Sequence, residues 1–262
     1  MCGDGCRRVG DPIGRRRRLG DPPSTGMGTA SRATVAIGTG GKATMVLKKS
    51  IMAFHPVDGP DTGLRTRFGG QPTWIDDPQW PISLTWDNPM RFICQIVLDP
   101  ELFGSLNGTM AYVFLTHPEV GSDFFDPDII FFEGGENAVI IQPNGHYDGA
   151  VQPLASGPSL YLEDGSRAAF EVETELGDDP DFVPQEDIAN SSAYFKATYA
   201  NKIGGSPGFF QGDDWPIGGP WKLLLQLDPD DAPFHLNLGA SPRLFAFISA
   251  DGTVGKLCIQ DT

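Results

Sequence analysis

The sequence has no hydrophobic run long enough to cross a membrane. None approaches the roughly 20 apolar residues that a bilayer-spanning helix needs. The arginine run Arg15–Arg18 is not followed by the apolar segment that a secretory or twin-arginine signal requires. These two absences predict a cytoplasmic protein without a membrane partner.

Cysteine and histidine are also scarce, with 4 of each among 262 residues. No CxxC pair occurs, and no histidine stands at zinc-ligand spacing from a cysteine, so we predict no metal site and no cofactor. Cys94 and Cys258 lie in apolar stretches that suit buried, reduced thiols. The phosphate loop GxxxxGK[ST] and the dinucleotide loop GxGxxG are missing as well. We therefore expect a protein that is not an enzyme, with a small-ligand binder or a hydrolase as the alternative.

Basic side chains are few outside the first 50 residues. Residues 1–50 hold 10 Lys+Arg and 3 Asp+Glu, whereas residues 51–262 hold 9 Lys+Arg and 31 Asp+Glu. A surface this acidic repels nucleic acid and anionic lipid. It attracts basic proteins, so we predict a basic protein or peptide as the partner and exclude nucleic acid.

Glycine and proline, in contrast, are abundant, with 33 and 23 residues between short apolar runs. Residues 1–50 show little apolar periodicity, and we expect a disordered basic leader or a start-site artefact. Residues 51–262 are expected to form one mainly β domain with few short helices. Strands are expected at residues 91–98, 109–116, 128–133, 138–142, 159–163, 167–174, 221–227, 243–249 and 255–260. One helix is expected between residues 184 and 204.

Two stretches of the sequence are nearly the same. Residues 69–82 align with residues 204–217 without a gap, at a constant offset of 135. The shared positions are Gly69, Gly70, Pro72, Trp80, Pro81 and Ile82 in the first stretch and Gly204, Gly205, Pro207, Trp215, Pro216 and Ile217 in the second. The glycine pairs predict a backbone that a Cβ would forbid, and the tryptophans predict apolar anchors on a sheet. Two copies of one unit, roughly residues 65–120 and 200–255, predict a roll or barrel-like β domain built by internal duplication.

The order GGxP, WP, Q(I/L)xxDP and an FxF-like strand, present twice, resembles the YwqG-like family. The resemblance covers roughly residues 65–262. It implies a mainly β roll with internal repetition and carries no established activity, so it transfers no catalytic residue. Some members of that family lie near bacterial toxin–immunity loci, which implies a bacterial protein that neutralises a basic toxin.

One acidic and aromatic cluster is the candidate for binding such a partner. Phe124 and Phe125 are flanked by Asp123, Asp126 and Asp128. An aromatic anchor ringed by acids is suited to a basic protein surface.

Two glutamines and two aspartates hold matching places in the two units. Gln95 and Gln226 either line a cleft between the repeats or satisfy the backbone of the glycine turns. Asp99 and Asp228 each precede a proline. They are either turn residues or a pair of catalytic carboxylates. A pocket with convergent polar groups would favour a ligand binder, and an exposed apolar patch would favour a structural or scaffold subunit. The oligomeric state is left open.

Overall fold

One antiparallel sheet is the main element of the computed structural model, which describes residues 47–57, 63–122, 124–187 and 192–261. Its ten strands follow in the order β12 (Gly255–Gln260), β11 (Arg243–Ser249), β10 (Trp221–Leu227), β9 (Lys202–Gly204), β1 (Leu47–Pro56), β8 (Ala169–Asp179), β2 (Arg67–Gly69), β4 (Arg91–Val97), β5 (Met110–Leu115) and β6 (Asn137–Gln142). A second sheet pairs β3 (Trp80–Pro81) with β7 (Val151–Gln152). The helices are α1 (Pro100–Phe103), η1 (Pro127–Ile130), η2 (Gln185–Asp187), α2 (Ser192–Thr198) and η3 (Pro229–Asp231). The prediction of a mainly β fold with few short helices is confirmed, and among the described residues no helix is long and apolar enough to span a membrane.

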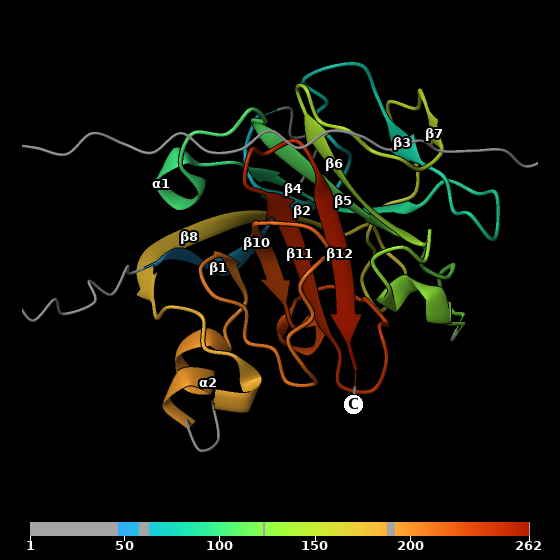
Figure 1. The fold of residues 1–262 in the computed structure, drawn as a ribbon. Helices are drawn as coiled ribbons and strands as arrows, with labels where there is room; N and C mark the ends of the chain where they lie inside the picture. The colour runs from blue at the N-terminus through green and yellow to red at the C-terminus, as the bar shows by residue number, and fades with distance from the viewer. Residues whose placement is uncertain (1–46, 58–62, 123, 188–191, 262) are drawn as a thin grey trace, which may run out of the picture. The chain divides into compact units, whose positions relative to one another are not determined.

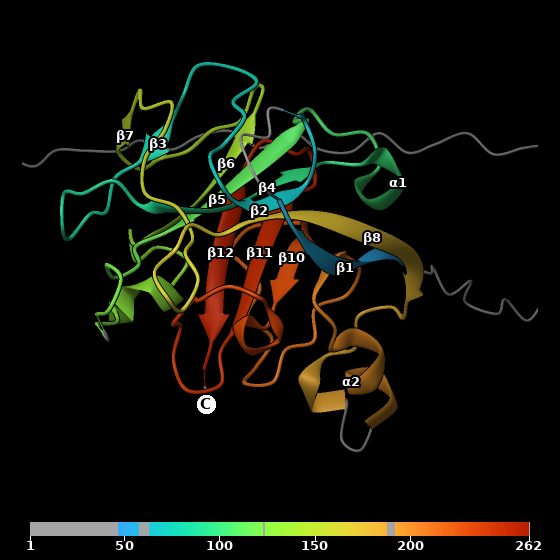
Figure 2. The same cartoon turned by 180° about the vertical axis from the view of Figure 1, so that it is seen from behind.

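The large sheet curls into a nearly closed, barrel-like form (Figures 1 and 2). Its two edge strands, β6 and β12, come close: a Cβ on Gly255 of β12 would stand 2.3 Å from Cγ1 of Val139 on β6. No ladder joins these two strands within the described part of the chain, so side-chain packing brings them together.

The strand order has the same pattern from both edges. At the centre, β1 pairs with β8 from Leu47↔Asp179 to Pro56↔Phe170. The first half-sheet (β2, β4, β5 and β6) borders β8, and the second half-sheet (β9, β10, β11 and β12) borders β1. The two central strands are exchanged relative to the chain order. β1 precedes the first half-sheet in the sequence but borders the second half-sheet. β8 precedes the second half-sheet in the sequence but borders the first.

Both faces of each half-sheet are apolar. The inner faces share one core, to which the first half-sheet contributes Ile93 and Val113 and the second contributes Leu224 and Ala246. The outer face of the first half-sheet packs on Trp80 through Phe92, Tyr112 and Phe114. The outer face of the second packs under Trp215 through Leu223, Phe245 and Phe247. Strands buried on both faces have continuous apolar runs, which is how these strands appear in the sequence.

A cover segment begins at the second glycine of each pair and packs on these outer faces. The first cover segment is residues 70–79, and the second is residues 205–214. All four glycines have positive φ, from +67° to +78°, as their sequence predicted. A Cβ on Gly69 would lie 2.2 Å from the Ala168 carbonyl oxygen, so close packing as well as φ requires glycine there.

Several expected elements differ. The stretch 128–133 is not a strand, because Asp126 accepts a hydrogen bond from Asp128 N (2.9 Å) and Pro127 opens the helix η1. The stretch 159–163 forms only isolated bridges. The single helix expected between residues 184 and 204 is replaced, where described, by the short η2 and α2. β1 was not expected as a strand, and its first four residues lie inside the range assigned to the leader; the structure of residues 1–46 lies outside the described part.

Candidate functional site

The two matched glutamines bind the cover segments of their own half-sheets. Gln95 accepts from Thr73 N (2.8 Å) and donates to Arg65 O (2.9 Å). Gln226 accepts from Gly208 N (2.8 Å) and donates to Ala200 O (3.0 Å) and Thr198 O (2.7 Å).

The main-chain partners Thr73 and Gly208, like Arg65 and Ala200, are 135 positions apart, which is the offset of the sequence alignment. Both glutamine side chains are fully buried, and four strands of the sheet separate β4 from β10. The contacts therefore favour a backbone clamp over the floor of a cleft between the repeats.

A second pair of glutamines, which the sequence reasoning missed, repeats this arrangement. Gln142 accepts from Asp76 N (3.3 Å) and donates to Asp77 O (2.8 Å). Gln260 accepts from Gln211 N (3.2 Å) and donates to Gly212 O (2.9 Å). The partners again differ by 135 in number, so two glutamines fix each cover segment.

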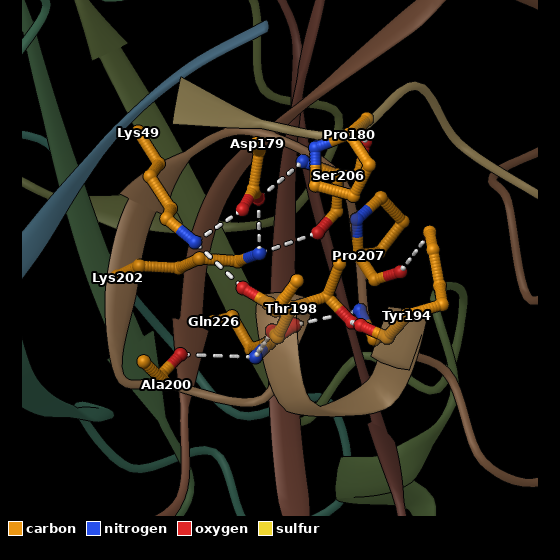
Figure 3. Close-up of polar contacts among 12 residues, drawn as sticks. Lys49, Asp179, Pro180, Tyr194, Thr198, Ala200, Lys202, Ser206, Pro207 and Gln226 are labelled. Atoms are coloured by element: carbon orange, nitrogen blue, oxygen red, sulfur yellow. Dashed lines mark hydrogen bonds and ion pairs between the residues drawn. The ribbon is translucent and has the colours of Figure 1, made fainter. Parts of the chain in front are cut away.

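A buried ionic cluster supports the second cover segment (Figure 3). Lys202 donates to Asp179 Oδ2 (2.5 Å) and Ser206 O (2.6 Å), and Lys49 pairs with the other oxygen of Asp179. Burial lowers the pKa of Lys202 to about 8, against the opposing effect of Asp179. Its counterpart Arg67, 135 positions earlier, donates to Thr73 Oγ1 (2.8 Å). Lys202 lines neither the cavity of about 550 Å³ described below nor two smaller cavities of about 190 and 320 Å³ in the described part of the chain, so its position indicates a structural role.

One sequence pattern that resembles a nucleophile motif has a structural explanation. Residues 204–208 read GGSPG, which has the spacing GxSxG. Ser206 is fully buried, and its hydroxyl donates to Pro180 O (2.6 Å). It follows the three-residue strand β9 and opens no helix, so it lacks the exposed strand-to-helix turn of a nucleophile.

The two strand-end aspartates act as caps. Asp99 accepts from Glu101 N (2.8 Å), and Asp228 accepts from Asp230 N (3.1 Å). Asp228 also pairs with the buried Arg243 (3.1 Å). This is the turn chemistry that their sequence positions suggested.

A cavity of about 550 Å³ lies at one end of the first half-sheet. We call it the Trp86 pocket. Its lining residues are Ser83, Trp86, Asn88, Pro89, Arg91, Thr116, His117, Pro118, Glu119, Ser122, Phe124, Asp126 and Pro158. This volume lies within the range of about 300–1,000 Å³ that is typical of ligand sites.

Two long connections of the first half-sheet build this pocket. Residues 82–90 join β3 to β4, whereas the corresponding residues 217–220 are only four. Residues 116–136 join β5 to β6, whereas residues 250–254 make the corresponding turn between β11 and β12. The pocket is thus made mostly by the parts in which the two halves differ, and Arg91 of β4 and Pro158 complete its lining.

A buried carboxylate holds these two connections together. Glu136 accepts from Ser83 Oγ (2.6 Å) and from Thr85 N (2.8 Å), so it fixes the start of the first connection. Asp126 accepts from Trp86 Nε1 (2.6 Å), which sets the position of the indole. The pocket is therefore held in shape before any ligand arrives.

Two exposed aromatic rings form the mouth of the pocket. Trp86 and Phe124 meet edge to face, with centroids 5.3 Å apart, and are 48% and 46% exposed. Large exposed apolar side chains cluster on the same two connections, namely Leu84, Trp86, Val120, Phe124 and Phe131. Exposed apolar groups that form one patch occur at protein interaction sites.

A buried arginine lies deeper in the pocket. Arg91 is 7% exposed and donates to Ser159 O (2.6 Å) and Pro118 O (3.3 Å). Its carboxylate partner among the described residues is Glu119, at 3.7 Å, whose side chain is 90% exposed. Burial lowers the pKa of Arg91, and Glu119 opposes this effect.

A neutral histidine stands beside this arginine. His117 Nε2 accepts from Asn237 N (3.0 Å), so the proton belongs on Nδ1, which faces the Tyr161 hydroxyl at 3.4 Å. Burial, aided by the charge of Arg91, lowers the pKa of His117 to about 3. The imidazole is therefore uncharged at neutral pH and Arg91 is the positive group of the floor.

The structure brings together some of the predicted binding residues. Phe124 and Asp126 line the pocket, and Asp128 is exposed nearby on η1. Phe125 is half-buried and packs against the main core, while Asp123 lies outside the described residues.

The sequence reasoning missed Trp86, Arg91, Thr116 and His117. One signal in the sequence could have indicated this region: the first unit is longer than the second where the two units cease to align.

Residues 66–251 match the family model described as "Domain of unknown function (DUF1963)". The chain therefore belongs to this family. A search of curated proteins found no match.

Proposed function

We propose that this member of the DUF1963 family is a non-catalytic, acidic module that binds a basic protein or peptide at the mouth of the Trp86 pocket. The observation that carries the proposal is the concentration of exposed apolar side chains on the two connections that only the first half-sheet has at this length. Buried residues of the sheet explain the fold, but a fold does not require Trp86 or Phe124 at its surface.

Charge supports the choice of a basic partner. The exposed acids Asp87, Glu119 and Asp128 stand on the same connections as the apolar group. Aromatic anchors within a charged rim are typical of protein interfaces, where the rim steers association and the anchors supply most of the affinity. In the more specific form of the proposal, the family is YwqG-like and the partner is a basic toxin that this chain neutralises.

We also propose that the two half-sheets derive from one duplicated unit. The constant offset of 135 in the glutamine contacts and the alike strand orders support this origin. After duplication, one copy would keep short turns while the other gained the binding connections.

A small-molecule binder is the second candidate, and the size and partly polar lining of the Trp86 pocket favour it. This pocket differs from the groove between repeats expected from sequence, because Gln95 and Gln226 do not line it. A structural or scaffold subunit would use the same apolar group for a permanent contact.

The test is capture of a partner by the immobilised full chain from a lysate of the source organism, at low and high salt. We expect one basic protein to be retained and then released by salt. Trp86→Ala and Phe124→Ala should each weaken capture by at least about tenfold. Ile217→Ala is the matched control, because Ile217 is 100% exposed and lies outside the pocket.

Each other outcome counts against the proposal. Capture that survives Trp86→Ala and Phe124→Ala would place the contact elsewhere. A partner held equally at both salt concentrations would indicate the scaffold subunit. If the immobilised chain retains no protein at either salt concentration, the small-molecule binder becomes the favoured hypothesis.

A further inference from the structure

Two buried side-chain atoms of residues beside the Trp86 pocket have no hydrogen-bond partner among the described residues: Arg91 Nε and Thr116 Oγ1. Both belong to residues that line the pocket, and Arg91 is more than nine-tenths buried. Burying a polar group without a partner is costly, so such atoms in a native protein call for an explanation. Both atoms are covered in this structure, so these side chains would turn toward the cavity to donate to a ligand that accepts hydrogen bonds.

The charge of the floor defines the ligand further. Arg91 is a permanent cation, and the carboxylate that pairs with it in the described part of the chain is the well-exposed Glu119 at 3.7 Å. The guanidinium also lies 4.9 Å from the centroid of the Tyr161 ring. Among the residues that the structure describes, no buried carboxylate pairs with it. An arginine in this state favours an anion, and a planar carboxylate matches the fork of its N–H donors.

The walls of the pocket define the rest of the ligand. Trp86 and Phe124 offer ring faces and edges, and Pro89, Pro118 and Pro158 add apolar surface. Aromatic rings pair well with such walls.

We propose that the Trp86 pocket binds a carboxylate that is attached to an aromatic or large apolar group, with the carboxylate on Arg91 and Thr116. Resting on the proposed function, the source would be the C-terminus of the partner chain; a free aromatic acid has the same chemistry. The acidic rim and the buried cation suit one partner. The rim would attract the basic side chains of a protein, and Arg91 would bind the carboxylate at its C-terminus.

The experiment is isothermal titration calorimetry of the full chain with N-acetylphenylalanine and with its amide. The two probes share the aromatic group and differ in the charge at one end. We expect the acid to bind and the amide to bind about 10- to 100-fold more weakly, because a hydrogen bond to a charged group is lost. Equal binding of the two probes would overturn the proposal, and so would failure of both this acid and the carboxylate-ended peptide described below to bind.

Variants locate the site on the protein. Thr116→Val, which keeps the shape of the side chain, should weaken acid binding about three- to tenfold. Arg91→Gln should abolish it. Arg243→Gln is the control for loss of a buried arginine, since Arg243 is 2% exposed and does not line the pocket. If Arg91→Gln fails to fold, Thr116→Val and the acid–amide comparison on the unaltered chain still decide the matter.

Peptides distinguish the two sources. A basic hexapeptide that ends in phenylalanine is compared with its C-terminal amide. Suppose that the peptide with a free C-terminal carboxylate binds more tightly than N-acetylphenylalanine. The natural ligand is then the C-terminus of a protein. If this peptide binds less tightly, the natural ligand is a free aromatic acid. Failure of every carboxylate probe, together with salt-sensitive capture that depends on Trp86, would overturn this inference and leave the proposed function standing.

Discussion

The two half-sheets solve the same packing problem, but only one of them carries the large pocket lined by Trp86. Each has a glycine pair, a cover segment and two glutamines that bind its main chain at equivalent positions. They differ in the connections 82–90 and 116–136, which are long in the first and short in the second. Shared features therefore describe the scaffold, and unshared features point to the function.

The largest expected effect concerns the ionic cluster that supports the second cover segment. Asp179→Asn would leave Lys202 buried beside Lys49 without a carboxylate. We expect a loss of about 3–5 kcal/mol in the free energy of unfolding, measured by urea denaturation. Asp178→Asn is the control, because its pair with Lys48 is exposed and should contribute less than about 1 kcal/mol. Equal losses would show that the cluster does not stabilise this half.

The glutamine clamps test whether the halves are equivalent. Gln95→Leu leaves two part-buried main-chain groups without their side-chain partner, and Gln226→Leu leaves three, of which two are buried, at about 1–3 kcal/mol for each buried group. We expect a loss of at least about 2 kcal/mol for Gln95→Leu and at least about 3 kcal/mol for Gln226→Leu, which leaves one more group without a partner. The losses should add in the double variant because the sites are far apart. Strongly unequal losses would break the correspondence between the halves.

A pH titration examines a group that lines the pocket of the first half. The pKa of His117 is about 3 in the folded chain and 6.5 is its ordinary value. Between these values the unfolded chain binds a proton that the folded chain does not, so stability falls as pH falls. From pH 7 to pH 5 this amounts to about 2 kcal/mol. His117→Gln should flatten that part of the stability curve, and a curve parallel to that of the unaltered chain would contradict the assignment.

The smallest expected effect on stability concerns the mouth of the pocket. Phe124→Ala removes a side chain that is nearly half exposed, so we expect a loss of less than about 1 kcal/mol in urea denaturation. Ile217→Ala is the matched exposed control. A loss of several kcal/mol would mean that Phe124 supports the fold, and a change in partner capture could then not be assigned to binding.

The scaffold was largely readable from the sequence because its signals are local. Glycine pairs with positive φ, tryptophans over apolar strands and a lone glutamine in a buried strand each have few structural explanations. β1 was missed because Lys48 and Lys49 interrupt its apolar pattern, and the strand pairs with partners more than 100 residues away.

The pocket was less predictable because its parts meet only through tertiary contacts. Phe124 and Asp126 stood out as an aromatic residue and an acid in one cluster, but nothing local links them to Trp86 or Arg91. Asp126 also served as a helix cap, which turned an expected strand into η1. Glu136 fixes the connection 82–90 from about 50 residues away, and no short-range pattern reveals such a contact.

The crossed positions of β1 and β8 bear on how the chain reaches its native state. The second half-sheet pairs with β1, which precedes the first half-sheet in the chain, and the first half-sheet pairs with β8, which follows it. Neither half-sheet can complete its hydrogen bonds until its distant partner strand is present. Contacts between residues so distant in sequence slow folding. The entropy of closing a long loop is lost before the contacts that stabilise the closed chain can form. During synthesis, the first half would therefore wait, with the β2 edge unpaired, until β8 has left the ribosome.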